Sequence, residues 1–273
     1  MNNPNIDISI PIYLKDKETF FRKERNGLYS LMVKDRGELG YLRINQMAKH
    51  IMEMCDGSHS IQNIVYEIES RFEVPKKAKL FDDIDRTIHI LWRLGLIGFK
   101  SYNYLLTRYQ VSKRGYTYVF MQEEDALEFN SNRYSIMLRN ACIDITTEYS
   151  CHDLRIRWLN CSESFFKVVS GNEEVLRMAV RVNRYTMGYD ITLLYISKPN
   201  NIAEVSSELF YFIDYIYKNT FALDVSSSGC AVFHFYSFDK SAIEMGFLLR
   251  GELRQEIKKQ SVFLFEYQLQ LKK

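Results

Sequence analysis

The side chains of this chain that could most directly bind a metal or take part in a reaction are those of its cysteines and histidines. The cysteines are Cys55, Cys142, Cys151, Cys161 and Cys230. No two of them form a Cys-x-x-Cys pair, and Cys151-His152 is the only place where a cysteine and a histidine are neighbours. One such pair cannot supply the four ligands of a tetrahedral zinc site, so we expect no metal centre. An odd number of scattered thiols is typical of a reducing compartment, and we expect a cytoplasmic protein.

Length, composition and charge narrow the class of protein. At 273 residues the chain exceeds the usual length of one domain, which indicates two domains. Hydrophobic residues make up 47% of the chain, enough for packed cores, and the net charge of +2 is too small to indicate a nucleic-acid partner. No stretch approaches the roughly 18 apolar residues of a membrane span, and the N-terminus lacks a signal-peptide pattern. We therefore expect no nucleic-acid and no membrane partner.

Three short strands followed by three helices are predicted in the first hundred residues. Asn26-Gly27 is a strong hairpin signal between two β-prone segments. Asn45 and Ser60 have the residue types of helix N-caps, and Asp56-Gly57 has the type that ends a helix. The predicted strands are Thr19–Arg25, Leu28–Lys34 and Leu39–Ile44, and the predicted helices are Gln46–Cys55, Ser60–Phe72 and Lys77–Leu94. This order of elements is typical of a winged helix-turn-helix.

A winged helix has two common uses. It can insert a helix into the major groove of DNA, or offer a strand edge and an adjacent helix to a peptide. The third predicted helix carries Asp82, Asp83 and Asp85 near its start. Carboxylates in a first turn suit the helix dipole but repel phosphates. DNA binding, and with it a role as a transcription regulator, is therefore disfavoured.

The run LRINQMAKHIMEMCDGSHSIQNIVYEIESRFEV, followed by DDIDRTIHILWRLGLI, resembles the PqqD family over about residues 15–100. These domains recognise the precursors of ribosomally made, modified peptides (RiPPs). The resemblance implies that a leader peptide adds as a strand to the edge of the third strand and packs on the third helix. The implied peptide-binding residues are Leu39, Gly40, Tyr41, Leu42 and Arg43 at the edge, with Asp83, Arg86, Thr87, Ile90 and Trp92 on the helix. The alternative is that the C-terminal half of the chain covers this edge.

The second half of the chain predicts a mixed sheet with flanking helices. Ser101–Gly115 has the composition of a connector, Glu123–Asn140 that of helices, and Arg155–Asn160 that of a short strand. Further strands are predicted at Ser164–Ser170, Val175–Tyr185, Tyr189–Ser197 and Cys230–Tyr236, with a helix at Ile202–Thr220. We expect an α+β or α/β chain of two domains, an N-terminal winged helix over 1–105 and a mixed sheet over 106–273.

The ending GFLLRGELRQEIKKQSVFLFEYQLQL, together with the strand–helix–strand order from Ser164 onward, resembles GNAT-type N-acyltransferases. This resemblance implies acetyl-coenzyme A or another acyl-coenzyme A as cofactor, with its pyrophosphate on a Gly-rich turn at a helix start. The corresponding residues here are Lys198, Asn200, Asn201, Ile202 and Ala203. Lys198 replaces the family's Arg or Gln, and Asn201 replaces its first glycine, which puts pyrophosphate binding in doubt. The implied catalytic residues are Asp190 and Tyr195 on the preceding strand and Tyr236 as general acid.

Two functions follow from these resemblances. In the first, a RiPP biosynthesis enzyme holds the leader of a precursor peptide by strand addition and N-acylates the core from an acyl-coenzyme A. In the second, the chain is a peptide-binding chaperone or scaffold. Its GNAT-like half has then lost coenzyme A binding and docks another maturation enzyme. The altered pyrophosphate turn favours the scaffold, and the covalent fusion of the two halves favours the enzyme.

Overall fold

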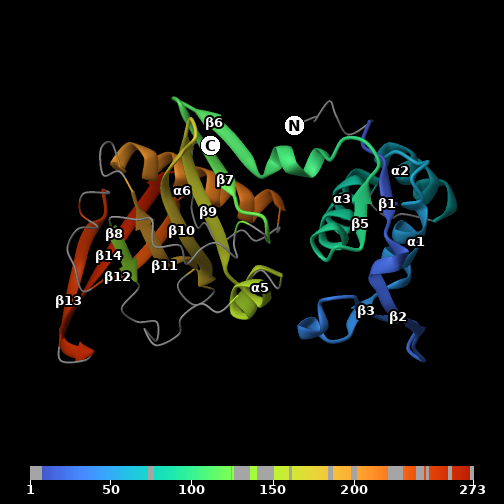
Figure 1. Cartoon of the computed structure of the whole chain (residues 1–273), viewed down its shortest axis with the longest axis horizontal. Helices are drawn as coiled ribbons and strands as arrows, with labels where there is room; N and C mark the ends of the chain where they lie inside the picture. The colour runs from blue at the N-terminus through green and yellow to red at the C-terminus, as the bar shows by residue number, and fades with distance from the viewer. Residues whose placement is uncertain are drawn as a thin grey trace. The chain divides into compact units, whose positions relative to one another are not determined.

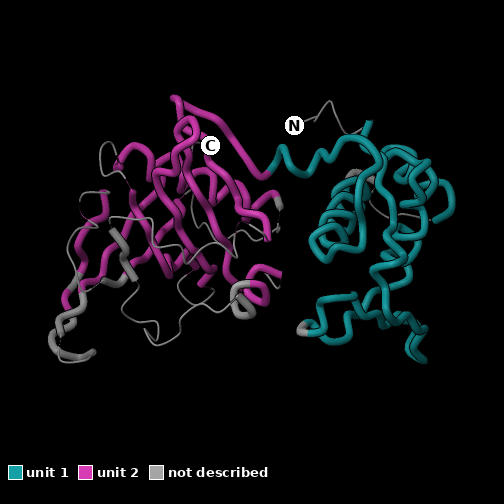
Figure 2. The backbone as a smooth tube through the Cα atoms, in the orientation of Figure 1, with its two compact units in different colours: residues 1–108 teal, residues 109–273 magenta. Residues whose placement is uncertain are grey.

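A computed structural model of the chain divides it into two compact units, Met1–Arg108 and Tyr109–Lys273, here called the N-terminal unit and the C-terminal unit (Figure 2). The structure describes residues 8–72, 77–123, 125, 136–139, 151–159, 162–183, 187–197, 202–220, 230–237, 243, 246–257 and 260–270. Both units combine helices with sheets (Figure 1). Among the described residues, no helix is long and apolar enough to cross a membrane.

Two small sheets lie in the N-terminal unit. The first is antiparallel, with the order β2 (Glu18–Lys23), β3 (Tyr29–Val33), β4 (Leu42–Ile44), and the second pairs β1 (Pro11–Tyr13) with β5 (Ile97–Phe99). Gly27, with φ at +79°, turns the chain from β2 to β3 as the Asn-Gly signal predicts. The three predicted strands are therefore present, although β4 is shorter than expected.

Three helices follow the sheet: α1 (Gln46–Met54), α2 (Ile61–Arg71) and α3 (Lys77–Arg93). Their predicted caps are confirmed. The Asn45 side chain accepts a hydrogen bond from the Ala48 amide at 2.8 Å, and the Ser60 hydroxyl accepts one from the Asn63 amide at 3.3 Å. Each cap satisfies one backbone N–H that the first helical turn leaves unpaired.

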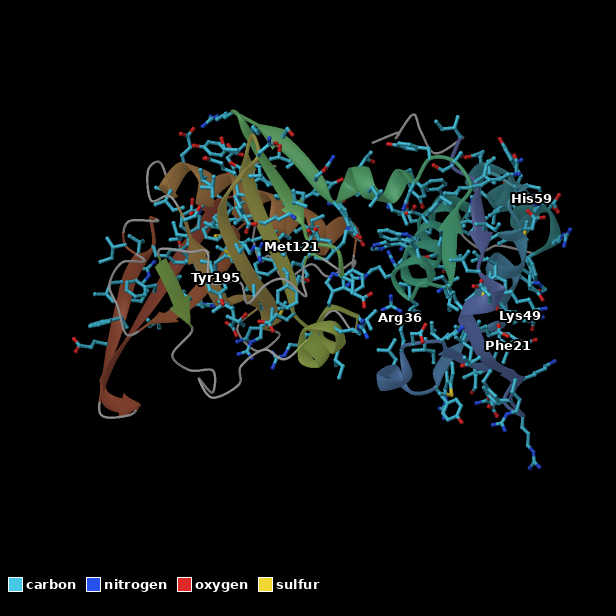
Figure 3. All side chains as sticks on the ribbon, in the orientation of Figure 1. Phe21, Arg36, Lys49, His59, Met121 and Tyr195 are labelled. Atoms are coloured by element: carbon cyan, nitrogen blue, oxygen red, sulfur yellow. The ribbon has the colours of Figure 1, made fainter. Side chains whose placement is uncertain are left out.

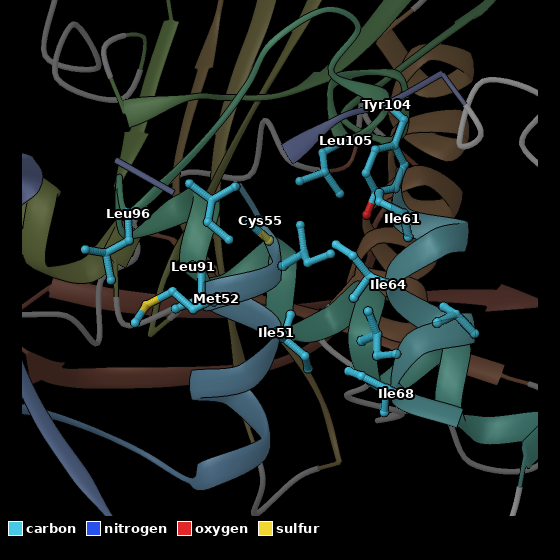
Figure 4. Close-up of a cluster of buried hydrophobic side chains, with 14 of the residues drawn as sticks. Ile51, Met52, Cys55, Ile61, Ile64, Ile68, Leu91, Leu96, Tyr104 and Leu105 are labelled. Carbon is cyan, nitrogen blue, oxygen red and sulfur yellow. The ribbon is translucent and has the colours of Figure 1, made fainter. Parts of the chain in front are cut away.

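The helices and one face of the three-stranded sheet enclose a single apolar core (Figure 4). Strand alternation turns Leu31 and Val33 into this core, while Phe21 stacks on Tyr29 at 5.4 Å between ring centroids. The ammonium group of Lys49, on α1, lies 5.4 Å from the same Tyr29 ring (Figure 3). The opposite face of the sheet is left to solvent.

The Cys-Asp-Gly motif forms the corner between α1 and α2. Cys55 is fully buried, and burial, followed by the charge of Asp56, raises the pKa of its thiol to about 12. The Asp56 carboxylate accepts hydrogen bonds from the amide and hydroxyl of Ser58 and from His59, and these bonds lower its pKa. The amide of Tyr13, at the end of β1, donates to the Cys55 carbonyl. These contacts make the motif a structural corner to which β1 is attached.

A sheet of nine strands forms the C-terminal unit. Eight of them follow the order β13-β14-β12-β11-β10-β9-β7-β6, and β8 pairs with β11 outside this path. The strands are β6 (Gln110–Lys113), β7 (Tyr116–Phe120), β8 (Ile136–Arg139), β9 (Ser164–Ser170), β10 (Glu173–Asn183), β11 (Gly188–Ile196), β12 (Cys230–Ser237), β13 (Leu248–Ile257) and β14 (Gln260–Gln270). Among the described strand pairs of this sheet only β11 and β12 are parallel, so the sheet is mixed.

The long helix α6 (Ile202–Thr220) connects β11 to β12 and covers one face of the sheet (Figure 1). Phe210 on α6 stacks on Phe233 of β12 with 4.4 Å between centroids, and Tyr189 of β11 donates a 2.9 Å hydrogen bond to Asp214 of α6. The helix predicted at Ile202–Thr220 and the strands that correspond to β9, β10, β11 and β12 are therefore confirmed, with differences of no more than about two residues in the strand bounds.

Three predictions for the C-terminal half were wrong. Arg155–Asn160 alternates polar with apolar residues like a strand, yet Cys151–Leu159 is a helix, α5. Its Trp158 is buried and donates to the Met121 carbonyl at 2.8 Å, so a tertiary contact overrides the local pattern. Residues 136–139, predicted to be helical, form β8, and part of the predicted connector forms β6. In both cases the segment is a strand because it pairs with the edge of another strand: β8 with β11, and β6 with β7.

We predict that Gly57→Ala destabilises the N-terminal unit. Gly57 has φ at +80°, and an added Cβ would lie 3.3 Å from the Cδ1 atom of Ile12. The left-handed backbone alone costs about 1–2 kcal/mol with a side chain. Urea unfolding followed by Trp92 fluorescence, in a Trp158→Phe background, measures the change. Gly37→Ala is the matched control because its φ is not positive and nothing lies within 4 Å of its added Cβ. Equal stability of the two variants would contradict the prediction.

Candidate functional site

The outer edge of β4 is the first candidate site. Its register with β3 pairs Leu42 with Leu31, Arg43 with Ser30 and Ile44 with Tyr29. On its other side β4 has no strand partner within the described part of the chain. An edge strand presents backbone N–H and C=O groups that another extended segment can pair with. The edge is therefore open to strand addition within the N-terminal unit.

Only two of the five edge residues expected from the sequence lie in this strand. Leu39 belongs to a short 3-10 turn, Gly37–Leu39, and Gly40 has φ at +60° and ψ at −145°. This conformation, which glycine adopts without a Cβ penalty, interrupts the extended path before Tyr41. Leu42 and Arg43 are in β4, whereas Tyr41 precedes it and is 65% exposed. The expectation of a longer strand from Leu39 was wrong.

A groove of about 570 Å³ begins where β4 ends. Asn45, the residue after β4, lines it together with the facing surfaces of α1 and α3. Its floor is apolar and includes Met47, Ile51, Phe72, Leu80 and Ile84. Four of the five helix residues of the expected peptide site line it as well: Asp83, Arg86, Thr87 and Ile90. Ile90 is 51% exposed, so it offers an apolar side chain to a ligand at this groove.

The polar residues of the groove are weakly tied to each other. Arg86 lies 3.9 Å from the Asp83 carboxylate, and both side chains are about half exposed or more. Such an exposed pair contributes little, about 0–1 kcal/mol, so both charges can pair with a ligand instead. The Thr87 hydroxyl donates to the Asp83 carbonyl at 2.8 Å. Trp92 lies outside this groove and packs against the core.

Asp85 has a different role from its neighbours on α3. Because α3 begins at Lys77, the expectation that Asp82, Asp83 and Asp85 occupy its first turn was wrong. Asp85 is buried and accepts hydrogen bonds from the Tyr104 hydroxyl at 2.5 Å and from the Arg108 guanidinium at 2.6 and 3.0 Å. Burial, and then the charge of Asp85, raise the pKa of Tyr104 well above its ordinary value. This carboxylate holds the end of the unit onto α3.

The second candidate site lies where β11 changes its neighbour in the C-terminal unit. β12 pairs with β11 only at Tyr189 and Asp190, and β8 pairs with the same edge from Leu193 to Ile196. Between these stretches Thr192 is an extra residue, because Val180 faces Ile191 and Ala179 faces Leu193. Bulges of this kind are frequent beside active sites. The carboxyl end of β11 then leads to the start of α6, the general position of ligand crevices in open sheets.

The expected catalytic residues do not gather at one point. Asp190 is 4% exposed and held by Arg181 at 3.3 Å and Asn183 at 3.0 Å. Tyr195 is buried on the other side of the bulge, in the stretch that pairs with β8 (Figure 3). Tyr236 is in β12 opposite Leu264, and its side chain lies outside the described part of the structure. Asp190 is therefore a carboxylate in an ion pair rather than a free base.

The sequence reading missed a row of polar residues across the face of the sheet opposite α6. His234 of β12 lies with its Nδ1 atom 3.8 Å from Asp190, and Glu266 of β14 is its cross-strand neighbour. Glu266 is in turn bound by Arg250 at 3.0 Å. Although burial acts in the opposite direction, hydrogen bonds from Gln268 and Arg250 lower the pKa of Glu266. A lone histidine inside the apolar run CAVFHFYS was the signal that could have identified this row.

The residues expected to bind the pyrophosphate of acyl-coenzyme A lie only in part within the described structure. Ile202 and Ala203 begin α6, while Lys198, Asn200 and Asn201 lie outside the described residues. Glu204 places a carboxylate in the first turn of α6, where it pairs with Arg114 and opposes a bound diphosphate. β8 pairs with the edge of β11 from Leu193 to Ile196. Among the described residues, no three His, Cys, Asp or Glu side chains form a set of metal ligands.

Comparison with known proteins gives one family match within the N-terminal unit and a group of distant structural similarities. Residues 31–97 match the family Coenzyme PQQ synthesis protein D (PqqD), which confirms the resemblance over less than half of the chain. No curated protein matches the chain. The solved structures that are similar include three acetyltransferases: the ribosomal-protein-S5-alanine acetyltransferase from Vibrio fischeri, the spermidine N-acetyltransferase from Vibrio cholerae in complex with CoA and spermine, and an acetyltransferase of the GNAT family from Streptococcus pneumoniae.

These structural similarities are distant. The Vibrio fischeri enzyme is 14% identical, with 58% of this chain and 95% of that chain covered and a TM-score of 0.39. The Vibrio cholerae enzyme is 15% identical, with 57% and 96% covered and a TM-score of 0.38. The Streptococcus pneumoniae enzyme is 12% identical, with 56% and 99% covered and a TM-score of 0.38. At these values the likeness establishes no activity for this chain.

We predict that Asp85→Ala destabilises the N-terminal unit by about 3 kcal/mol. Removing one partner of a buried ion pair leaves Arg108 and the Tyr104 hydroxyl without their acceptor. Asp83→Ala on the same helix is the control, because the Asp83 side chain is 67% exposed and should change stability by less than about 0.5 kcal/mol. Urea unfolding by Trp92 fluorescence compares the two. Similar losses for both variants would show that the buried network is not a source of stability.

Proposed function

We propose that the chain binds an extended segment of a ribosomally made precursor peptide, which adds as a strand to the edge of β4 and packs in the groove between α1 and α3. The observation that carries this proposal is the coincidence of two features at one place. β4 has no strand on its outer edge among the described residues, and an apolar groove with a half-exposed Ile90 begins at the residue that follows β4. The match of residues 31–97 to the PqqD family supports a precursor peptide as the ligand.

The contacts of this mode account for weak binding of a single segment, with a Kd of roughly tens of micromolar. Each backbone hydrogen bond contributes about 0.5–1.5 kcal/mol net. Each apolar side chain that becomes buried contributes about 1.5–3 kcal/mol. Three bonds along the short β4 and two anchors in the groove sum to about 4.5–10.5 kcal/mol. An association cost of at least about 4 kcal/mol leaves no more than about −6.5 kcal/mol, which is a Kd of roughly 20 μM. In this proposal the N-terminal unit acts as a winged helix that recognises peptides rather than DNA.

For the C-terminal unit we propose the non-catalytic role, in which it serves as a scaffold or docking surface for a second maturation enzyme. Transfer of an acyl group from an acyl-coenzyme A to the core of the precursor is the other candidate, favoured by the crevice position at the carboxyl end of β11. Three features of the described residues oppose it: β8 on the β11 edge, Glu204 in the first turn of α6, and the ion-paired state of Asp190.

We predict that Ile90→Asp weakens peptide binding at least about tenfold. The substitution removes an apolar anchor of about 1.5–3 kcal/mol and adds a charge to an apolar groove, while the exposed position leaves the fold intact. The probe is a fluorescein-labelled peptide enriched from a display library of short random peptides on the full-length chain, and anisotropy gives Kd. Tyr66→Asp is the matched control, since Tyr66 is 61% exposed on α2 outside the groove.

The same probe separates strand addition from other modes. N-methylation of every second amide of the peptide should abolish binding in one frame and spare it in the other, because a strand points alternate N–H groups to one side. If no peptide is enriched, or if Ile90→Asp binds like Tyr66→Asp, the proposed function is wrong.

We predict that acetyl-coenzyme A at millimolar concentration gives no heat in calorimetry with the full-length chain. β8 occupies the β11 edge next to the crevice, and Glu204 repels the diphosphate. In a strand only one of two neighbouring amides points towards β11. The double variant Met137→Pro, Leu138→Pro therefore removes that hydrogen-bond donor from β8 in either case. Binding by the double variant alone would identify β8 as the obstacle. Binding by the unmodified chain would overturn the scaffold proposal and restore acyl transfer.

A further inference from the structure

The solvent face of the three-stranded sheet is hollowed, with a volume of about 770 Å³. This surface of the sheet, with its hollow, is here called the outer face. Six of the residues that line it belong to β2 and β4 or lie next to these strands: Phe20, Arg22, Lys23, Arg25, Tyr41 and Arg43. None of these six side chains belongs to the core below the sheet. Strand register places Arg22, Ser30 and Arg43 side by side on the outer face, and Leu31, Leu42 and Ile44 towards the core.

The outer face is strongly basic for so small a surface. It holds four cations, Arg22, Lys23, Arg25 and Arg43, and one carboxylate, Glu24. Glu24 accepts hydrogen bonds from the Arg22 guanidinium at 2.8 and 3.2 Å, which is the main cause that lowers its pKa. The charge of Arg43 also lowers the pKa of Glu24, so the lining carries four cations against one carboxylate, although the whole chain carries only +2. Such a surface attracts acidic groups.

Two aromatic rings lie within this basic surface. Tyr41 packs edge-to-face on Phe20 with 5.5 Å between centroids, and the Arg22 guanidinium lies 5.6 Å from the Phe20 centroid. Tyr41 remains 65% exposed in this arrangement. Exposed aromatic side chains beside arginine are frequent anchors in interfaces, since they add contact area at a low entropic cost.

Strand geometry links the outer face to the peptide site. Side chains that are directly opposite each other on paired strands point to the same face of a sheet. A segment added to β4 therefore points the residues opposite Leu42 and Ile44 towards the helices, and the residue opposite Arg43 towards the outer face. Alternate positions of one bound segment meet two different surfaces, an apolar one and a basic, aromatic one.

We infer that the outer face is a second recognition surface for the precursor peptide, and that the bound segment alternates apolar residues with acidic ones. This inference rests on the proposed function and names the chemistry of its substrate. The apolar side chains of the peptide point towards the helices and the groove between α1 and α3. Its carboxylates point to the outer face and pair with Arg43 and the neighbouring cations. Acidic peptide is favoured over single-stranded nucleic acid, which also binds basic aromatic surfaces, because the hollow adjoins an open strand edge.

The test repeats the display selection with three full-length proteins: the unmodified chain, Arg43→Glu, and Arg71→Glu. Arg71 is an exposed arginine on α2 that lines neither the groove nor the outer face, so it is the matched control for charge reversal. From the unmodified chain and from Arg71→Glu we expect peptides that alternate apolar residues with Asp or Glu. From Arg43→Glu we expect the same apolar positions with Lys or Arg between them.

Affinity measurements on one enriched acidic peptide complete the test. Arg43→Glu should weaken its binding about three- to tenfold at low salt, because an exposed attraction becomes a repulsion, and added salt should shrink this difference. Enriched peptides without an acidic bias, unchanged by Arg43→Glu, would overturn the inference and leave the proposed function standing. A fluorescent single-stranded oligonucleotide that binds tightly, and loses binding in Arg43→Glu, would overturn it in favour of nucleic acid. Selection of no peptides at all contradicts the proposed function itself.

Discussion

The pairing of backbone groups at strand edges is the constraint on which both units depend. A backbone N–H or C=O that is shielded from water needs a partner, so each strand edge must be solvated, paired or covered. In the N-terminal unit β4 is left without a strand on its outer side among the described residues, next to an apolar groove. In the C-terminal unit the corresponding need of β11 is met twice, by β12 at its start and by β8 at its end.

The two units therefore differ in how readily a strand edge can accept an additional strand. An open edge beside a half-exposed Ile90 can accept a guest strand at little cost, because the fold already orders both surfaces. The edge of β11 can accept a guest only if β8 leaves, which costs the hydrogen bonds between Leu193–Ile196 and that strand. The edge of β4 is therefore free of a strand partner among the described residues, whereas the edge of β11 beyond Thr192 is already paired with β8.

Several residues whose types suggest chemistry serve the architecture instead. Cys55 is a core residue with a raised pKa, and Asp56 organises the corner between α1 and α2 through the Ser58 and His59 amides. Asp85 holds Tyr104 and Arg108 rather than a ligand. In the C-terminal unit, Asp190 is held by Arg181 and Asn183. The polar residues that remain available to a ligand are those on surfaces, such as Asp83 and Arg86 in the groove and Arg43 on the outer face.

The sequence alone determined the features that depend on neighbouring residues. The Asn26-Gly27 hairpin, the caps at Asn45 and Ser60, and the helix α6 follow from local turn chemistry and from apolar spacing. The groove residues Asp83, Arg86, Thr87 and Ile90 were also predictable, through the family resemblance. Only the tertiary structure decided the short β4, the helix α5, the pairing of β8 with β11 and the row from Arg181 to Arg250. In each of these a contact between residues distant in the chain outweighs the local preference, as the Trp158 bond to Met121 does for α5.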